Sequence, residues 1–195
     1  MRIRAGFNAV VLALVALATT SCGDVVRTGR SPVYLIMDSL TGQRGGSATS
    51  SFGTPLSSDV ITNVTTFADL GQVTLRVAPK DVTSPLGPTT NNDVTVTRYH
   101  VAYVRSDGQN RQGLDVPFAF DAAVTGTAPA GGGTITLTFE LVRAVAKRET
   151  PLVTLVSTST VVTTIANVTF YGRDQAGNEV TVSGLITVDF GNFQD

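Results

Sequence analysis

The side chains that most often carry acid–base, nucleophilic or metal chemistry are sparse in this sequence. The chain of 195 residues contains one histidine, His100, and one cysteine, Cys22. A single histidine excludes a metal site built from several histidines, and no G-x-S-x-G sequence is present to supply a serine nucleophile. We therefore expect His100 to lie at the surface of the fold, without a catalytic role.

Carboxylates are the other candidates for catalysis or cation binding. Glycoside hydrolysis needs two carboxyl groups that flank one bond, and the sequence alone places no two aspartates within reach of each other, so we expect these scattered acids to be solvated. Asp107–Asn110 and Asp174–Glu179 offer oxygen ligands for Ca²⁺ but lack the dense acidic spacing of a calcium loop, so turn chemistry explains them. The aspartates considered for a catalytic pair are Asp38, Asp59, Asp115 and Asp121. We expect no catalytic residue, no metal site and no cofactor.

Aromatic rings offer a third kind of site, because an exposed group of them can stack on the apolar faces of sugars. Most aromatic rings of a β-sandwich lie in its core. The chain also has no tryptophan, the strongest sugar-stacking residue. The rings considered for a sugar platform are Tyr99, Tyr103, Phe118, Phe120, Tyr171 and Phe193. Carbohydrate binding or adhesion at the cell surface is therefore kept as the alternative function.

The N-terminus predicts export. Met1–Arg4 is positively charged, and Val10–Ala18 is an apolar run of the length found in signal peptides. The run is too short to span a bilayer, which takes about 20 apolar residues. Residues 1–21 are therefore predicted to form a signal peptide.

Two cleavage sites fit this segment, and they give Cys22 different roles. Ala16–Ala18 is a small-x-small site for ordinary signal peptidase, which would leave Cys22 as a spare thiol. Thr20–Cys22 resembles the end of a bacterial lipobox, although Thr19 stands where the lipobox pattern prefers Leu. With one cysteine the domain forms no internal disulfide, so packing and hydrogen bonds must hold the fold.

The lipobox resemblance also implies a place in the cell. It implies a lipid on Cys22 that binds the membrane, a tether over residues 22–31 and a single domain over residues 32–195. Gly23 follows the cysteine, in place of the Asp that marks inner-membrane retention in enterobacterial lipoproteins. The resemblance therefore favours the outer membrane or cell surface, with a periplasmic or secreted protein as the alternative.

The charge of the exported chain restricts its partners. From Cys22 onward there are 15 acidic and 12 basic residues, and the longest basic concentration, Lys147-Arg148, is followed at once by Glu149. Nucleic-acid binding requires a clustered basic surface, so nucleic acid is excluded as a partner. An unknown protein or glycan remains.

The arrangement of apolar residues predicts β-strands. Val73, Leu75 and Val77 alternate with polar residues, and the same period of two runs through 134–141. Val94–Arg105 is a longer strand whose apolar phase shifts near Thr97-Arg98, as a β-bulge would cause. One short helix is expected, with Thr150 as its N-cap and Pro151 at its first position.

The last part of the chain predicts a β-hairpin over Ala166–Phe190. Its two apolar strands are joined by Asp174–Asn178, in which Gly177 and Asn178 tolerate positive φ and Asp174 can accept bonds from nearby backbone N–H groups.

This turn resembles the D-x-x-G-N turn between the last two strands of many bacterial immunoglobulin-like and fibronectin type III-like domains. The resemblance implies an all-β fold, an antiparallel immunoglobulin-like β-sandwich. Without tryptophan or a second cysteine, the antibody-type core of Trp packed on a disulfide is impossible. Together these features predict a cell-envelope lipoprotein that acts as a binding or structural module without catalytic activity.

Overall fold

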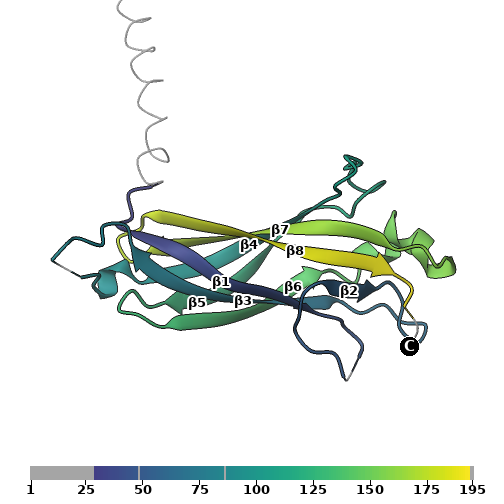
Figure 1. Ribbon diagram of the computed structural model, residues 1–195, viewed down its shortest axis with the longest axis horizontal. Helices are drawn as coiled ribbons and strands as arrows, with labels where there is room; N and C mark the ends of the chain where they lie inside the picture. Colours follow the sequence, from purple (N-terminus) through teal and green to yellow (C-terminus); the bar gives the residue numbers. More distant parts are fainter. Residues whose placement is uncertain (1–28, 48, 86, 194–195) are drawn as a thin grey trace, which may run out of the picture.

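The computed structural model describes residues 29–47, 49–85 and 87–193. The predicted signal peptide and Cys22 lie outside the described residues. Eight strands pack as two sheets (Figure 1). They are β1 (Val33–Gln43), β2 (Leu56–Asp59), β3 (Asp69–Pro79), β4 (Val94–Val104), β5 (Phe120–Ala128), β6 (Thr134–Val142), β7 (Val162–Asp174) and β8 (Glu179–Gly191). No helix in this described part is long and apolar enough to cross a membrane.

The strand order confirms the predicted all-β sandwich. One sheet has the order β1-β3-β6 and the other the order β2-β8-β7-β4-β5. An immunoglobulin-like sandwich has its first, second and fifth strands in one sheet and its third and last two in the other, which is the pattern seen here for β1, β3, β6 and β4, β7, β8. The pairing is antiparallel throughout except between β2 and β8, which run parallel. The five-stranded sheet is therefore mixed, because the short edge strand β2 lies beside the last strand.

The period-two patterns correspond to strands with one buried face. Val73, Leu75 and Val77 of β3 are buried, as are Leu137, Phe139 and Leu141 of β6. Strand β4 pairs with both neighbours through a register shift between Val96 and Arg98. The bulge predicted near Thr97-Arg98 is thus confirmed. Strand β5 and the four-residue β2 were not predicted from the sequence.

An aromatic cluster joins the two sheets in place of the antibody-type Trp and disulfide. Tyr99 of β4 and Phe170 of β7 belong to one sheet, and Phe139 of β6 to the other. The ring of Phe139 lies edge-on to both, with centroids 4.9 Å from Tyr99 and 5.1 Å from Phe170. The Tyr99 hydroxyl donates to the Glu140 carbonyl at 3.1 Å, which satisfies its polar atom inside the core. Gly71 leaves room for Phe139, since a Cβ there would lie 2.4 Å from its ring.

The β7–β8 turn has the geometry that its sequence favours. Gly177 has a φ of +83°, a backbone conformation that a residue with a Cβ adopts only under strain. One carboxylate oxygen of Asp174 accepts the backbone N–H of Asn178 at 2.8 Å, and the other accepts the Asn178 side-chain amide at 2.9 Å. The turn residues Asp174, Gly177 and Asn178 therefore hold the last hairpin together.

The helical segment differs in detail from its prediction. Leu152–Ser157 is a 3₁₀-helix, and its N-cap is Pro151 instead of Thr150. The Thr150 hydroxyl donates outside the helix, to the Gly113 carbonyl at 2.6 Å. Two further 3₁₀ turns in the described residues span Thr90–Asn92 and Ala146–Arg148. The β-branched residues of the segment disfavour a longer α-helix.

The strands run along the molecule, so the connections gather at its two ends (Figure 1). We call the end where the described chain starts at Gly29 the N-terminal end. It carries the connections 80–93, 129–133 and 175–178. The opposite end, which we call the loop end, carries the segments 44–55, 60–68, 105–119 and 143–161. The segment 105–119 projects from the sandwich at this end.

Candidate functional site at the loop end

Exposed apolar side chains are concentrated at the loop end. Of the twelve large exposed apolar residues among those described, nine lie on its segments or on the strand ends that lead into them. They are Val64, Phe67, Leu70, Val104, Leu114, Phe118, Val145, Val153 and Val161. The other three are Tyr34 and Val82 near the N-terminal end, and Leu185 on the outer face of β8. Concentrated exposed apolar surface is typical of an interaction site.

The turn at residues 62–65 holds one of these side chains in a strained conformation. Thr62 and Thr65 exchange two backbone hydrogen bonds of 2.8 and 2.9 Å. The two residues between them, Asn63 and Val64, have φ of +45° and +64°. A β-branched residue in this left-handed region costs about 1–2 kcal/mol, and Gly is the usual choice at such a position. Val64 is nevertheless 92% exposed, so its side chain adds no packing energy to the domain.

Hydrogen bonds connect the segments of the loop end to one another. The Arg148 guanidinium donates to the Thr66 hydroxyl at 2.6 Å, which joins segment 143–161 to segment 60–68. The Thr150 hydroxyl donates to the Gly113 carbonyl, which joins segment 143–161 to segment 105–119. The exposed apolar residues are thus carried on one connected framework.

A buried ion pair lies beneath this framework. The Lys147 ammonium donates to a carboxylate oxygen of Asp69 at 2.8 Å, with the two side chains 1% and 0% exposed. The same oxygen accepts the backbone N–H of Gly45 at 2.9 Å, and the other oxygen accepts the Ser58 hydroxyl at 2.5 Å. Asp69 therefore ties segment 44–55, strand β2 and segment 143–161 to the start of β3.

Burial shifts the titration of both members of this pair. Burial raises the pKa of Asp69, against the charge of Lys147 and the hydrogen bonds from Gly45 and Ser58. Burial lowers the pKa of Lys147, against the neighbouring charge of Asp69. Each shift moves its group toward the neutral form, because the charged forms have lost their hydration.

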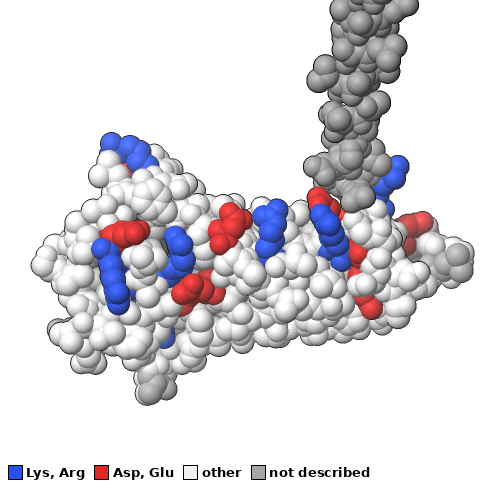
Figure 2. Space-filling view, turned by 180° about the vertical axis from the view of Figure 1, so that it is seen from behind, with Lys and Arg blue, Asp and Glu red and all other residues white. Residues whose placement is uncertain are grey.

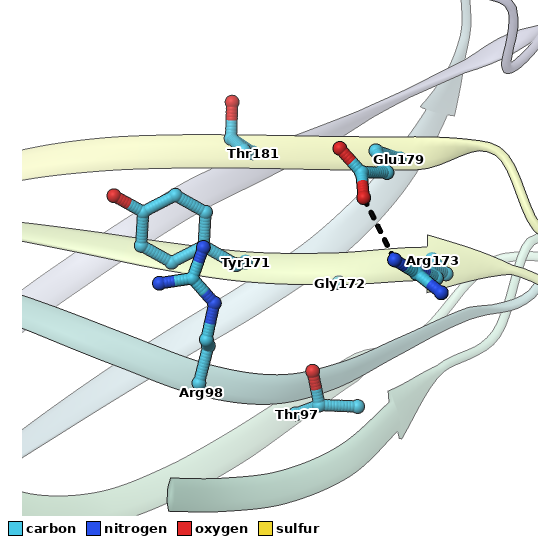
Figure 3. Close-up of a pocket in the computed structure, with 7 residues that line it drawn as sticks. All are labelled: Thr97, Arg98, Tyr171, Gly172, Arg173, Glu179 and Thr181. Atoms are coloured by element: carbon cyan, nitrogen blue, oxygen red, sulfur yellow. Dashed lines mark hydrogen bonds and ion pairs between the residues drawn. The ribbon is translucent and has the colours of Figure 1, made fainter. Parts of the chain in front are cut away.

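A shallow hollow on the outer face of the five-stranded sheet is the second candidate (Figure 3). It has a volume of ≈ 230 Å³ and is lined by Thr97, Arg98, Tyr171, Gly172, Arg173, Glu179 and Thr181. The bulge exposes both Thr97 and Arg98, and the Arg98 guanidinium lies 3.7 Å from the centre of the Tyr171 ring. Arg98 is also paired with Asp121, and Arg173 with Glu179 at 2.8 Å. Because these charges already have partners, the hollow offers a ligand less than the loop end does.

His100 lies on the outer face of β4, as predicted, and its side chain is one-third exposed. Its Nδ1 is 3.2 Å from a carboxylate oxygen of Asp121, which also pairs with Arg98. No serine or cysteine nucleophile is among its contacts in the described chain. The arrangement is that of a partly exposed side chain in polar contact with a neighbouring carboxylate.

The four aspartates considered for a catalytic pair lie on different elements and have different partners. Asp38 pairs with Arg76 at 2.8 Å, Asp115 with Arg111 at 2.7 Å, and Asp121 with His100 and Arg98. Asp59 is buried and accepts the Thr62 hydroxyl and the Phe193 backbone N–H. The structure thus shows each of the four held by its own neighbours.

The loop carboxylates considered for calcium are held by local turn contacts. Asp107 accepts the Gln109 backbone N–H and pairs with Arg105, and the Asn110 side chain accepts the Arg105 backbone N–H at 2.6 Å. Within residues 29–47, 49–85 and 87–193, no three His, Cys, Asp or Glu side chains are grouped as metal ligands.

The six aromatic rings considered for sugar binding do not share one exposed surface. Tyr99, Tyr103 and Phe120 are buried in the core. The Tyr171 ring is covered by Arg98 on the sheet face. Phe118 is exposed at the loop end, where its ring packs close to Gly113.

Lys147, Asp69 and Ser58 were not identified as site residues from the sequence. Lys147 was counted with Arg148 as a basic pair, and nothing in its neighbours along the chain indicates burial.

On the face shown in Figure 2, basic and acidic side chains lie beside one another, with uncharged surface between the groups.

Comparisons with models of protein families, with curated proteins and with solved structures found no match for this chain.

Proposed function

We propose that this protein is a lipid-anchored binding module of the cell envelope, and that the loop end is its recognition surface. The observation that carries the proposal is the difference between the two ends of the sandwich. Four segments, nine exposed apolar side chains and a strained turn lie at one end, and the chain enters at the other. Loops on a rigid scaffold are where binding residues concentrate.

The position of Gly29, where the described chain starts, gives this surface an orientation. If Cys22 carries the lipid, the tether of residues 23–31 spans at most about 30 Å when extended, at about 3.3–3.6 Å per residue. The two longest strands, β7 and β8, have 13 residues each, so the sandwich is about 40 Å long at about 3.3 Å per residue. The N-terminal end then faces the membrane, and the loop end points away from it toward a partner.

The chemistry of the loop end favours a protein partner over a charged polymer. Its exposed apolar side chains lie among ion pairs such as Arg105–Asp107 and Arg111–Asp115, which are neutral as pairs. An apolar centre with a polar rim is the usual composition of a protein–protein interface. We propose no catalytic step, since the four aspartates considered for a catalytic pair and the histidine are each engaged with neighbours.

Site-specific photocrosslinking in intact cells tests the recognition surface. A photoreactive residue at Leu114 or Val153 is expected to give adducts of discrete mass with an envelope component, because both side chains are exposed at the loop end. Val82 and Leu185 are matched controls, since they are 84% and 65% exposed but lie elsewhere. Adducts at the controls alone, or at none of the four positions, contradict the proposal. A glycan adduct at the loop-end positions would contradict a protein partner and indicate a carbohydrate partner.

Cell fractionation of a Cys22→Ala variant tests the anchor. The variant is expected to move from the membrane fraction to the soluble fraction, because the lipid would be its only membrane contact. Its melting temperature should stay unchanged, since the substitution lies outside the core of the sandwich, whose buried residues begin at Ser31 and Val33. Membrane association that survives the substitution would contradict the lipid anchor at Cys22. It would favour the alternative in which Cys22 is a spare thiol of an exported protein.

A further inference from the structure

Lys147 and Asp69 form an ion pair, and their placement also allows the two side chains to react with each other. They are 78 positions apart in the chain, and the amine nitrogen lies 2.8 Å from the nearer carboxylate oxygen. Both side chains are essentially without solvent contact. An ammonium group has three N–H donors, and among the described residues Asp69 supplies the one acceptor for them. A fully charged pair is therefore poorly satisfied at this position.

The neutral pair fits the site better. Moving one proton from the Lys147 ammonium to the Asp69 oxygen in contact with it gives a free amine beside a carboxylic acid. Burial favours both products, since it lowers the pKa of the amine and raises the pKa of the acid. The amine then has a lone pair beside the Asp69 carboxyl group, whose nearer oxygen is 2.8 Å away, and both side chains are closed off from water.

We propose that Lys147 and Asp69 join through an intramolecular amide bond, formed between Nζ and Cγ with loss of one water. The Nζ lone pair adds to Cγ, and the negative charge that develops on Oδ2 is stabilised by the Ser58 hydroxyl bonded to it at 2.5 Å. Oδ1 already carries the first proton from Nζ. It takes the second, the Cγ–Oδ1 bond breaks, and water leaves. One C–N bond forms, one C–O bond breaks, and no oxidant or reductant is needed.

Neighbouring groups hold the carboxyl in position for this reaction. The Gly45 backbone N–H donates to Oδ1, and a Cβ on Gly45 would lie 2.0 Å from the Ala68 carbonyl oxygen, so the close approach requires glycine. Ser58 lies on β2 and is itself fully buried. After the reaction Oδ2 becomes the amide oxygen and keeps its hydrogen bond from Ser58.

The amide would give this domain an internal covalent crosslink, which it cannot obtain from a disulfide because the chain has one cysteine. It joins the first residue of β3, in the three-stranded sheet, to the segment that leads into β7, in the five-stranded sheet. The inference is independent of the proposed function, because it concerns how the loop end is held and not what binds there.

Peptide mass spectrometry of the full mature chain tests the amide. Trypsin cleaves after Arg44, Arg76, Arg143 and Arg148 but not after an acylated lysine. The expected product is a branched peptide in which residues 144–148 are joined to residues 45–76, with a mass one water below the sum of the two. Free cleavage after Lys147, with both peptides at their separate masses, overturns the proposal. Cleavage after Lys80 in the same digest shows that trypsin was active.

Two variants extend the test. Lys147→Arg keeps the positive charge but has no primary amine, so the branched peptide should be lost. Ser58→Ala removes the group that stabilises the developing charge, and its crosslinked fraction should fall below that of the parent at equal times after synthesis. Complete crosslinking of Ser58→Ala at the parental rate contradicts the role given to Ser58. The result for the parent chain does not depend on whether either variant folds.

Discussion

Replacing Phe170 by alanine is expected to lower the free energy of unfolding by about 3–5 kcal/mol. Phe170 is fully buried, and its ring contacts Phe139 of the opposite sheet edge-on at 5.1 Å and lies 6.0 Å from Tyr99. The change removes the apolar area of the ring and leaves a cavity between the sheets. Without a disulfide, the domain has no covalent link between these strands at the same place.

Chemical denaturation measures this effect, with Thr138→Ala as the matched control. Thr138 lies on β6 beside Phe139 but points to solvent, so its substitution should change stability by less than about 0.5 kcal/mol. Equal losses for the two variants would contradict the assignment of the inner and outer faces. An equal slope of free energy against denaturant shows that the same surface is exposed on unfolding.

Replacing Lys147 by methionine is expected to destabilise the domain by about 3–5 kcal/mol. Methionine fills a similar volume, but it leaves the carboxyl of Asp69 buried without its partner. The loops that Asp69 connects, through Gly45 and Ser58, should loosen with it. Denaturant unfolding gives the size of the effect, and amide hydrogen exchange in segments 44–55 and 143–161 gives its location.

Two comparisons separate this effect from a general loss of charge. Lys80→Met removes an exposed lysine at the other end of the domain and should have little effect. Adding Asp69→Asn to Lys147→Met removes the unpaired carboxyl while an amide oxygen still accepts from Gly45 or Ser58, so the double variant should recover part of the loss. If Lys147→Met is no more damaging than Lys80→Met, the ion pair does not organise the loop end.

The aromatic cluster and the buried ion pair stabilise different parts of the sandwich. Tyr99, Phe139 and Phe170 connect the two sheets through apolar contact in the middle of the strands. Lys147 and Asp69 connect the loops at one end through hydrogen bonds. The strands are thus expected to persist when the ion pair is broken, and the segments of the loop end are the part that should lose their order first.

The sequence by itself determined the strands that have one solvent-exposed and one buried face. Successive side chains of a strand point to opposite faces, so such a strand shows alternating polar and apolar residues. This holds for β3 and β6, and a break in the alternation located the bulge in β4. The β7–β8 turn was predictable for a similar local reason, since Gly177 and Asn178 are the residue types that its backbone requires.

Strands β2 and β5 escaped prediction because their patterns are weak. β2 has four residues in a Ser-rich region and exists through its pairing with β8. β5 is an edge strand of small residues, and Gly126 in it leaves space for Leu137 of the other sheet, a requirement that only packing creates. The prediction of Thr150 as a helix N-cap was wrong because its hydroxyl finds a partner in a distant segment, at Gly113.

The candidate site was decided by the tertiary structure alone. Composition and motifs argued against catalytic, metal and nucleic-acid sites. From the sequence alone, however, Lys147 was interpreted only as part of a basic pair with Arg148. Its burial depends on Asp69, Ser58 and Gly45, which lie far from it in the chain and meet it only when four connections gather at one end of the sandwich. A local pattern can specify the conformation of its own segment, whereas a contact between distant segments is set by how the sheets pack. Only packing removes both side chains from water and brings them together.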